Sequence, residues 1–403
     1  MIRGDQSKDN IVKKPERKKA TEGKKHKSKC LPAGKYCLIS CDMDTTGRRL
    51  KDEICHIAAY TPTSQFSQYI MPYENLNPRA RRRHNIRVTT DGRFRVLRSN
   101  INNKVIRTKS EIFGLIDFLN WLAEVKSKSD RAGVILIFHE PKKMVSYMLL
   151  EALQRYHLLG KFSEIVKGFA NGHALAEEKC SATMKSLNLK VLSRVLLDRE
   201  EQFDNASNRA KIIWEIAQHL GQGEQKNLAA GIGDPNRVIL GNMVEVVRQY
   251  SHSIFVELIE LKELRKVAER SSSFQPIFSA ARKMNYRDIQ RTNVLRSILA
   301  EGKSDYNTMK STYDTNGKQG LIKELAKLQI TRKDQQYDLL EILDSHFDPK
   351  RTATFPNTKT PRKTVNRKLI KTVSSDDSGA VSLDTTRTTS PLKNAADNTV
   401  KTN

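Results

Sequence analysis

Cysteine, aromatic residues and long apolar runs are all scarce in this chain of 403 residues. Its five cysteines are odd in number and include no CxxC pair, which excludes a disulfide framework and a zinc ribbon. The longest apolar runs, such as 134–138, are far too short to span a bilayer, and no apolar signal segment opens the chain. We therefore expect a soluble protein of a reducing, intracellular compartment without membrane contact.

Acidic residues are also in short supply. Lys and Arg number 71 against 45 Asp and Glu, a net charge of +26, and residues 31–347 alone hold 49 basic and 36 acidic side chains. A charge of this sign predicts a polyanionic partner, most simply nucleic acid. Hydrophobic residues make up only 38% of the chain. We therefore expect the basic ends, 1–30 and 350–403, to be disordered arms.

Alternating strand and helix patterns predict an α/β domain at 31–222 with a mixed sheet. β-Rich or continuously apolar runs predict strands at 36–42, 54–61, 65–71 and 133–138. Asp-Gly between alternating β formers predicts a hairpin at 87–97. Apolar residues at three- and four-residue spacing predict helices from Ser110, around 148–153, at 186–196 and at 206–220.

The pattern becomes purely helical after a glycine-rich break at 221–234. Residues 238–267 read as one long helix or two, within a stretch of linker and connecting helices at 223–284. Shorter amphipathic segments at 285–349 predict a small all-α unit that closes its own apolar core.

Two aspartates end the first predicted strand, in the sequence CDMDTTG at 41–47. Alternation along a strand places Asp42 and Asp44 on one face. Cleavage of a phosphodiester by two divalent ions about 3.5–4 Å apart needs several carboxylates from different elements. CDMDTTG, followed by EICHIAAY (53–60), resembles the first motif of the DEDD-type 3′–5′ exonucleases, which have a ribonuclease-H-like fold.

The other two motifs of that exonuclease family are altered here. The second, H-N-x-x-F-D, corresponds to HEPKKM (139–144), which puts Met144 at the aspartate position. The third, H-x-A-x-x-D-A, corresponds to NASNRA (205–210), which puts Arg209 there. A guanidinium stays charged at any working pH and repels Mg²⁺. With Asp42 kept and the family glutamate shortened to Asp44, the resemblance implies a domain without catalysis, metal or other cofactor.

Eight longer segments carry a second resemblance: LPAGKY (31–36), DTTGRRLKDEI (44–54), AAYTPT (58–63), QYIMPYENLNPRARRRH (68–84), SEIFGLIDFLNWL (110–122), NASNRAK (205–211), SFQPIF (273–278) and LLEILDSHFDPK (339–350). Over roughly residues 31–350, the chain resembles the exuperantia family of insect maternal-effect proteins. The resemblance implies a pseudo-exonuclease domain and a SAM-like domain at 285–349. It also implies a homodimer formed through the exonuclease-like domain. This dimer would lie in cytoplasmic ribonucleoprotein particles of the germline. There it would bind maternal mRNA and help to localise anterior determinant transcripts in the oocyte.

The candidate RNA contacts are basic residues. They are Arg79, Arg81, Arg82, Arg83 and Arg87, five in nine residues, together with Lys142, Lys143 and Arg209. Tyr69, Tyr73 and His84 lie in or near the arginine run, so we expect bases to stack there while guanidinium groups neutralise phosphates. Little base-specific readout is visible in the sequence.

Plainer interpretations remain open for the same residues. Asp42 and Asp44 would serve the fold alone if they bonded the amides of the turn at 45–47. Arg209 fits a solvated charge as well as a phosphate contact, and the arginine run fits an oligomer interface. Two rival functions follow: a weakly active metal-dependent exoribonuclease that uses Asp42, Asp44 and Glu140, and a protein scaffold without direct RNA contact.

Overall fold

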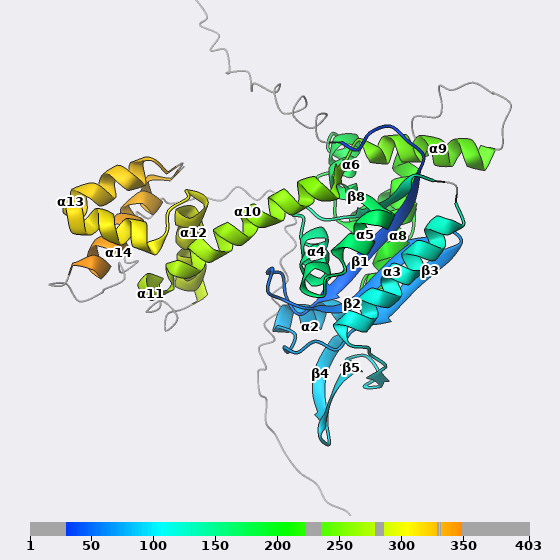
Figure 1. Ribbon diagram of the computed structural model, residues 1–403, viewed down its shortest axis with the longest axis horizontal. Coiled ribbons are helices and arrows are strands. Elements are labelled where there is room, and N and C mark those ends of the chain that lie inside the picture. The colour runs from blue at the N-terminus through cyan, green and yellow to red at the C-terminus, as the bar shows by residue number, and fades with distance from the viewer. Residues whose placement is uncertain are drawn as a thin grey trace, which may run out of the picture.

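Two bodies joined by one long helix make up the part of the chain that the structure, a computed structural model, describes (Figure 1). It describes residues 30–129, 131–222, 235–278, 286–328, 330 and 332–348. Both expected arms, 1–30 and 350–403, lie outside these residues, except for Cys30. The segments 223–234 and 279–285 of the expected linker also lie outside them. No helix in the described ranges is long and apolar enough to cross a membrane.

A six-stranded mixed sheet forms the centre of the larger body, in the order β3-β2-β1-β7-β8-β9. The strands are β1 (Tyr36–Thr45), β2 (Ile54–Thr61), β3 (Ser64–Tyr69), β7 (Gly133–Phe138), β8 (Val166–Asn171) and β9 (Ser251–Ser253). β1, β7 and β8 run parallel, and the other neighbours are antiparallel. The predicted mixed sheet is confirmed. β7 is buried on both faces, which explains its continuous apolar sequence.

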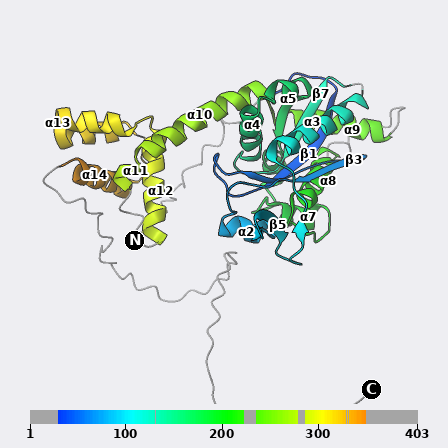
Figure 2. The same cartoon turned by 60° about the horizontal axis from the view of Figure 1, so that its bottom comes forward.

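Helices cover both faces of this sheet (Figure 2). One face carries α3 (Glu111–Ser127), α4 (Val145–Arg155), α5 (Leu159–Ile165) and the start of α10 (Ile254–Ser273). The other carries α6 (Gly172–Cys180), α7 (Leu189–Leu196), α8 (Ala206–Gln222) and α9 (Pro235–Arg248). Because side chains alternate along a strand, Phe138 of β7 enters the first core and Ile137 the second.

β9 and α9 extend the sheet domain beyond the boundary expected at residue 222. β9 pairs with β8 and divides the stretch 238–267 into two helices, α9 and α10. A Cβ on Gly168 would lie 2.3 Å from the carbonyl oxygen of His252, so this pairing needs a glycine. An edge strand of three polar residues has no alternation of apolar side chains, which is why the sequence pattern did not predict it.

The arginine-rich stretch forms a helix and a second, three-stranded sheet. These elements are α2 (Pro78–His84), β4 (Ile86–Asp91), β5 (Phe94–Ser99) and β6 (Val105–Ile106). The predicted hairpin is confirmed, with Gly92 at φ 60° in its turn. α2 was not predicted. Its start is nevertheless visible in the sequence, because Asn77 accepts the N–H groups of Arg79 and Ala80 and is followed by Pro78.

The smaller body is a helical unit with one apolar core, as predicted. It contains α11 (Gln275–Phe278), α12 (Tyr286–Glu301), α13 (Tyr306–Ala326) and α14 (Lys333–Phe347). The unit starts earlier than the expected residue 285, because Phe274 and Phe278 share a core with Leu299 and Leu343. α13 is interrupted at Gly317, whose φ of 57° suits glycine.

Candidate functional site

A buried ion cluster stands where the sequence predicted the altered exonuclease centre. Asp42 and Asp44 lie side by side on β1, and Arg209 reaches them from the first turn of α8. The guanidinium donates from Nε to Asp42 and from one terminal nitrogen to Asp44. The other terminal nitrogen donates to the Phe203 carbonyl oxygen at 3.0 Å. Only 3% of the Arg209 side chain is exposed, so it is held entirely by the protein.

Two histidines complete the surroundings of Asp44. His56 Nδ1 lies 3.3 Å from one carboxylate oxygen and His84 Nδ1 lies 2.6 Å from the other. Burial alone would raise the pKa of Asp44, but Arg209 and the two histidines hold it well below its usual range. Burial alone would lower the pKa of Arg209, yet both carboxylates raise it above its ordinary value. Asp44 and Arg209 are therefore charged at neutral pH and are paired with each other.

The residues present do not fit a pair of catalytic metal ions. Mg²⁺ requires free oxygen ligands in near-octahedral geometry. Here both aspartates are engaged by Arg209, and Met144 offers only a thioether at the second-motif position. The plainer interpretation, that the aspartates bond the turn at 45–47, is wrong, since their oxygens contact Arg209, His56 and His84 instead.

Glu140, the third carboxylate of the rival nuclease hypothesis, serves the backbone. One of its carboxylate oxygens accepts the N–H groups of Met144 and Val145 at 2.8 and 2.9 Å. These amides open α4 and have no partner within the helix, so Glu140 acts as its cap. Burial raises the pKa of Glu140 above its ordinary value, and these hydrogen bonds oppose the shift.

An open cleft of about 1120 Å³ lies beside the ion cluster. Its walls come from the ends of β7 and β8, from α2 and from residues 185–190. Five basic residues of the lining have no hydrogen bond or ion pair with any residue that the structure describes: Arg48, Arg83, Lys142, Lys185 and Lys190. Burial and the charge of Arg209 lower the pKa of Arg83. Glu140 is the one acidic residue among the described residues of the lining, so the cleft is strongly positive.

His139 connects two walls of the cleft through a hydrogen bond and adds no charge to it. Its Nε2 donates to the Leu187 carbonyl oxygen at 2.7 Å, which joins the end of β7 to the 185–190 wall. Burial lowers the pKa of His139 to about 4, and the nearby His173 adds to this effect. The ring is therefore neutral at pH 7. The cleft offers phosphate-binding cations on its rim and apolar surface from Met144, Leu187 and Phe203.

Comparison with known proteins identifies the family. The chain is 36% identical to maternal protein exuperantia of Drosophila melanogaster over 391 residues, which cover 82% of this chain and 72% of that relative. The chain belongs to the exuperantia family. The models for the exuperantia RNase H-like and SAM-like domains match residues 36–196 and 275–346.

Two further exuperantia relatives show similar identity. Exuperantia-1 of Drosophila pseudoobscura pseudoobscura is 32% identical over 395 residues, which cover 89% of this chain and 79% of the relative. Exuperantia of Drosophila virilis is 35% identical over 359 residues, which cover 81% and 72%. These findings confirm the expected RNase H-like domain followed by a SAM-like domain.

The arginine run of this exuperantia-family chain is spread over α2, the cleft and β4. Arg79, Arg81 and Arg82 are exposed on α2, and Arg83 lines the cleft. Arg87, on β4, donates to the side-chain oxygens of Asn100 and Asn103, each at 2.7 Å. All five remain candidate RNA contacts, with Arg87 fixed in place by the neighbouring turn.

Two of the three rings expected to stack on bases are engaged elsewhere. His84 is buried against Asp44, which anchors the end of α2 to the ion cluster. Tyr69 stacks on His56 with ring centroids 3.8 Å apart, and burial raises its pKa to about 12. Tyr73 is largely exposed. The expectation is therefore wrong for His84 and Tyr69 because both rings support the ion cluster.

Lys143 and Arg209 are not RNA contacts in this arrangement. Lys143 Nζ lies 2.8 Å from Glu257, 2.9 Å from Glu260 and 2.5 Å from His252 Nδ1. Those three residues bring ligand atoms within 4.8 Å of one another, as a metal site does, but the ammonium already binds all three. Arg209 has each guanidinium nitrogen engaged. Lys142 is exposed on the cleft rim, and its contact with RNA stays a prediction.

The sequence did not predict that His56 and His84 contact Asp44. It also did not predict that three further basic residues, Arg48, Lys185 and Lys190, line the cleft. Arg48 directly follows the first motif, so its neighbourhood was readable from the sequence. Lys185 and Lys190 reach the cleft only because residues 185–190 fold against the end of β7. No local pattern predicts that contact.

Proposed function

We propose that this chain is a non-catalytic RNA-binding protein that acts in the localisation of maternal mRNA in the oocyte. The observation that carries the proposal is the Arg209 guanidinium, bonded to Asp42 and Asp44 where a nuclease of this fold needs free carboxylates. An RNA strand beside this centre meets cations without meeting a metal-activated water. The domain would thus retain RNA and leave it intact.

Direct RNA binding is supported by charge that the protein itself leaves uncompensated. This charge comes from the five unpaired cations of the cleft and from Arg81 and Arg82, which are exposed on α2. Cations of this kind bind phosphates in any sequence and release counterions, so affinity falls with salt. Specificity would then come from the shape of the folded RNA.

The wider setting follows from the family. Its relatives are named maternal proteins. For this chain we infer a homodimer formed through the RNase H-like domain, together with other ribonucleoprotein components. It would act in cytoplasmic ribonucleoprotein particles of the germline, on maternal transcripts that include anterior determinants.

One experiment separates this function from its two rivals. The purified full-length protein is mixed with an end-labelled, structured RNA that has a single-stranded 3′ tail, with Mg²⁺ or Mn²⁺, and is followed on native and denaturing gels. We expect a shifted band and full-length RNA. Shortening that disappears in Asp42→Asn would establish the nuclease, and an unshifted, intact RNA would establish the scaffold.

The cleft has its own matched test. Lys185→Ala/Lys190→Ala should weaken RNA binding and make the dependence of log affinity on log salt less steep by roughly 1.4–1.8, because each lost phosphate contact contributes about 0.7–0.9 to the slope. Lys35→Ala/Lys161→Ala removes the same charge from exposed positions outside the cleft lining. Equal losses in the two double variants would mean that the cleft has no special part in binding.

A further inference from the structure

We propose that the outer face of the small sheet β4-β5-β6 is a platform on which unpaired bases of single-stranded RNA stack. The proposal rests on the RNA-binding function above and names the form of RNA and the surface that receives it. None of the residues on this face lines the cleft. The platform is therefore a separate site.

The register of the small sheet defines its two faces. Ile86, Val88, Leu97 and Ile106 share the inner face and pack in one apolar cluster with Cys55 and Leu76. The intervening residues share the outer face, where Thr89 pairs with Val96, Asp91 with Phe94, and Arg98 with both Arg87 and Val105. An antiparallel sheet with one buried face normally turns polar side chains to water. This one turns Phe94, Val96 and Val105 outward.

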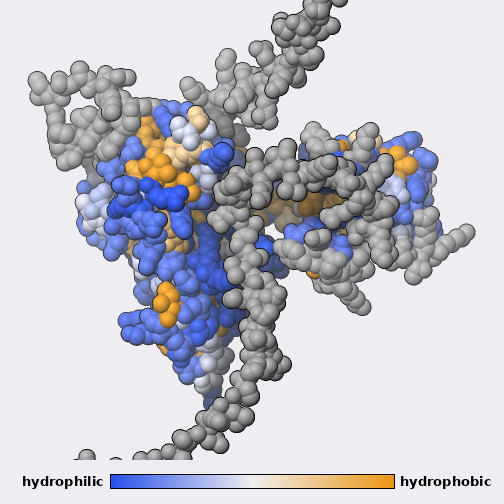
Figure 3. Space-filling model, turned by 180° about the vertical axis from the view of Figure 1, so that it is seen from behind, coloured by the Kyte–Doolittle hydropathy of each residue, from blue (hydrophilic) through white to orange (hydrophobic). Residues whose placement is uncertain are grey.

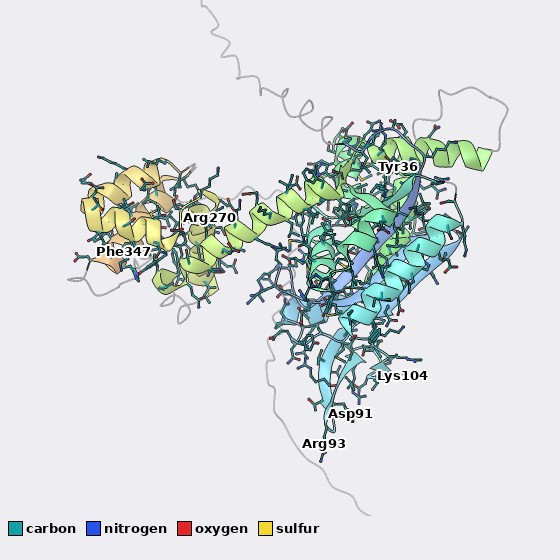
Figure 4. All side chains as sticks on the ribbon, in the orientation of Figure 1. Tyr36, Asp91, Arg93, Lys104, Arg270 and Phe347 are labelled. Atoms are coloured by element: carbon teal, nitrogen blue, oxygen red, sulfur yellow. The ribbon has the colours of Figure 1, made fainter. Side chains whose placement is uncertain are left out.

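Phe94 and Val105 are largely uncovered by the rest of the described chain, and Val96 is partly buried. Phe94 is 76% exposed and Val105 is 52% exposed. The hairpin projects away from the body, and Figure 4 shows Asp91 and Arg93 at its far tip and Lys104 in the next turn. An exposed aromatic ring on a projecting element favours a binding role, because a ring buried in the core contributes more to folding.

Charge decides which partner fits this face. Residues 79–109 contain eleven Lys and Arg and a single acidic residue, Asp91. Asp91 is itself paired with Arg98 at 2.5 Å. Figure 3 shows this end of the domain as largely hydrophilic, with a small hydrophobic patch set in it. Aromatic and apolar surface framed by positive charge matches the bases and phosphates of a single strand, whereas the bases of a duplex are already stacked.

The two outer-face arginines are held in place before any RNA arrives. Arg87 donates to Asn100 and Asn103, and Arg98 donates to the Asn103 carbonyl oxygen at 3.1 Å. A guanidinium fixed in one orientation gives up little conformational freedom when it stacks on a base or binds a phosphate. α2 contacts both β1 and β4, so its exposed arginines connect the cleft with the platform.

Phe94→Ala in the full-length protein tests the platform. Binding of a short fluorescent single-stranded RNA, followed by anisotropy, should weaken about tenfold, as expected for one lost stacking contact. The salt dependence should stay unchanged, because no charge is removed. Phe94→Trp should bind at least as well as the wild type. Phe255→Ala, which removes a ring that is 71% exposed on α10, is the matched control and should bind normally.

A cross-link gives a second readout that does not depend on affinity. RNA containing 4-thiouridine should cross-link to the peptide that contains Phe94 when irradiated. Equal binding by the wild type and Phe94→Ala, or equal losses in Phe94→Ala and Phe255→Ala, would overturn the platform and leave RNA binding itself intact. A wild type that binds no RNA would instead remove the proposed function and the platform with it. If Phe94→Ala instead converted an RNA-free dimer to monomers, the outer face would be a dimer interface, and the platform would be overturned.

Discussion

Arg209 determines what the two aspartates of β1 are free to bind. Its guanidinium binds Asp42 and Asp44 directly. Buried charges are tolerated when they are paired and hydrogen-bonded, and this cluster meets both conditions. The same residue therefore opposes metal binding and stabilises the sheet domain, by joining β1 to α8.

Removing that cation should destabilise the domain strongly. Arg209→Met leaves two buried carboxylates without their partner, so the free energy of unfolding should fall by about 3–5 kcal/mol. Urea denaturation measures the change. Arg199→Met breaks a partly exposed pair with Glu215 and should cost at most about 1 kcal/mol. Similar losses in both variants would contradict the structural role of the buried cluster.

His139 should give the stability of the domain a distinct pH dependence. Its folded-state pKa is about 4, against about 6.5 in an unfolded chain. Between these values the unfolded state binds more protons, so the free energy of unfolding should decrease as pH falls from about 6.5 to 4. Below pH 4 this group should cause no further decrease. In His139→Gln this part of the decrease should disappear, as measured by denaturation at a series of pH values. An unchanged pH profile would exclude His139 as its source.

At the scale of single elements, α2 connects the ion cluster to the surface that we propose binds RNA. Its Asn77 cap and Pro78 start the helix, and His84 fixes its end against Asp44. Arg81 and Arg82 are thereby presented to solvent on a short, firmly held helix. The sequence showed an arginine run, but a run of charge indicates neither a helix nor the side it faces.

Charge reversal on α2 should weaken RNA binding without unfolding the protein. Arg81→Glu/Arg82→Glu should reduce affinity at least tenfold at low salt, because each reversal adds repulsion to a lost phosphate contact. The difference from the wild type should shrink as salt increases. Lys35→Glu/Lys161→Glu carries the same charge change on exposed positions away from α2. RNA affinity that is unchanged in the α2 variant at moderate salt would favour the scaffold hypothesis.

At the scale of the whole molecule, α10 sets how the two bodies are joined. Its first half is fixed to the sheet domain by Lys143, Glu257 and Glu260, and Arg265 bonds Glu151 on α4. Its last turns reach the helical unit, where Arg270 donates to the Ala300 carbonyl oxygen at 2.8 Å (Figure 4). One continuous helix thus belongs to both bodies.

Lys143→Met should loosen this junction. It leaves the buried carboxylate of Glu257 without its cation, so we expect a loss of about 3–5 kcal/mol in the free energy of unfolding. Small-angle scattering should also show a larger radius of gyration. Lys142→Met changes the exposed neighbour in the same way and should leave both quantities unchanged. A compact Lys143→Met protein with normal stability would contradict the role of this cluster.

Much of this protein was predictable from the sequence alone. Strong alternation, continuous apolar runs and helical spacing predicted β1, β2, β3 and β7, the hairpin and the C-terminal helical unit, because burial of apolar side chains leaves a pattern in the chain. The residues Met144 and Arg209, at positions where the resemblance to the exonucleases calls for aspartate, were equally readable, since they are a matter of residue identity. The three-residue strand β9 and the short helix α2 carry no such pattern.

Only the tertiary structure decided what the charged residues do. Arg209 and Asp44 are 165 positions apart, and Lys143 and Glu257 are 114 apart. Neither pairing leaves a trace in local composition. Adjacent Lys142 and Lys143 look alike in the sequence, yet one is exposed at the cleft and the other is tied to α10. Periodicity records which side chains are buried, whereas the partner of a charge is set by the packing of elements distant along the chain.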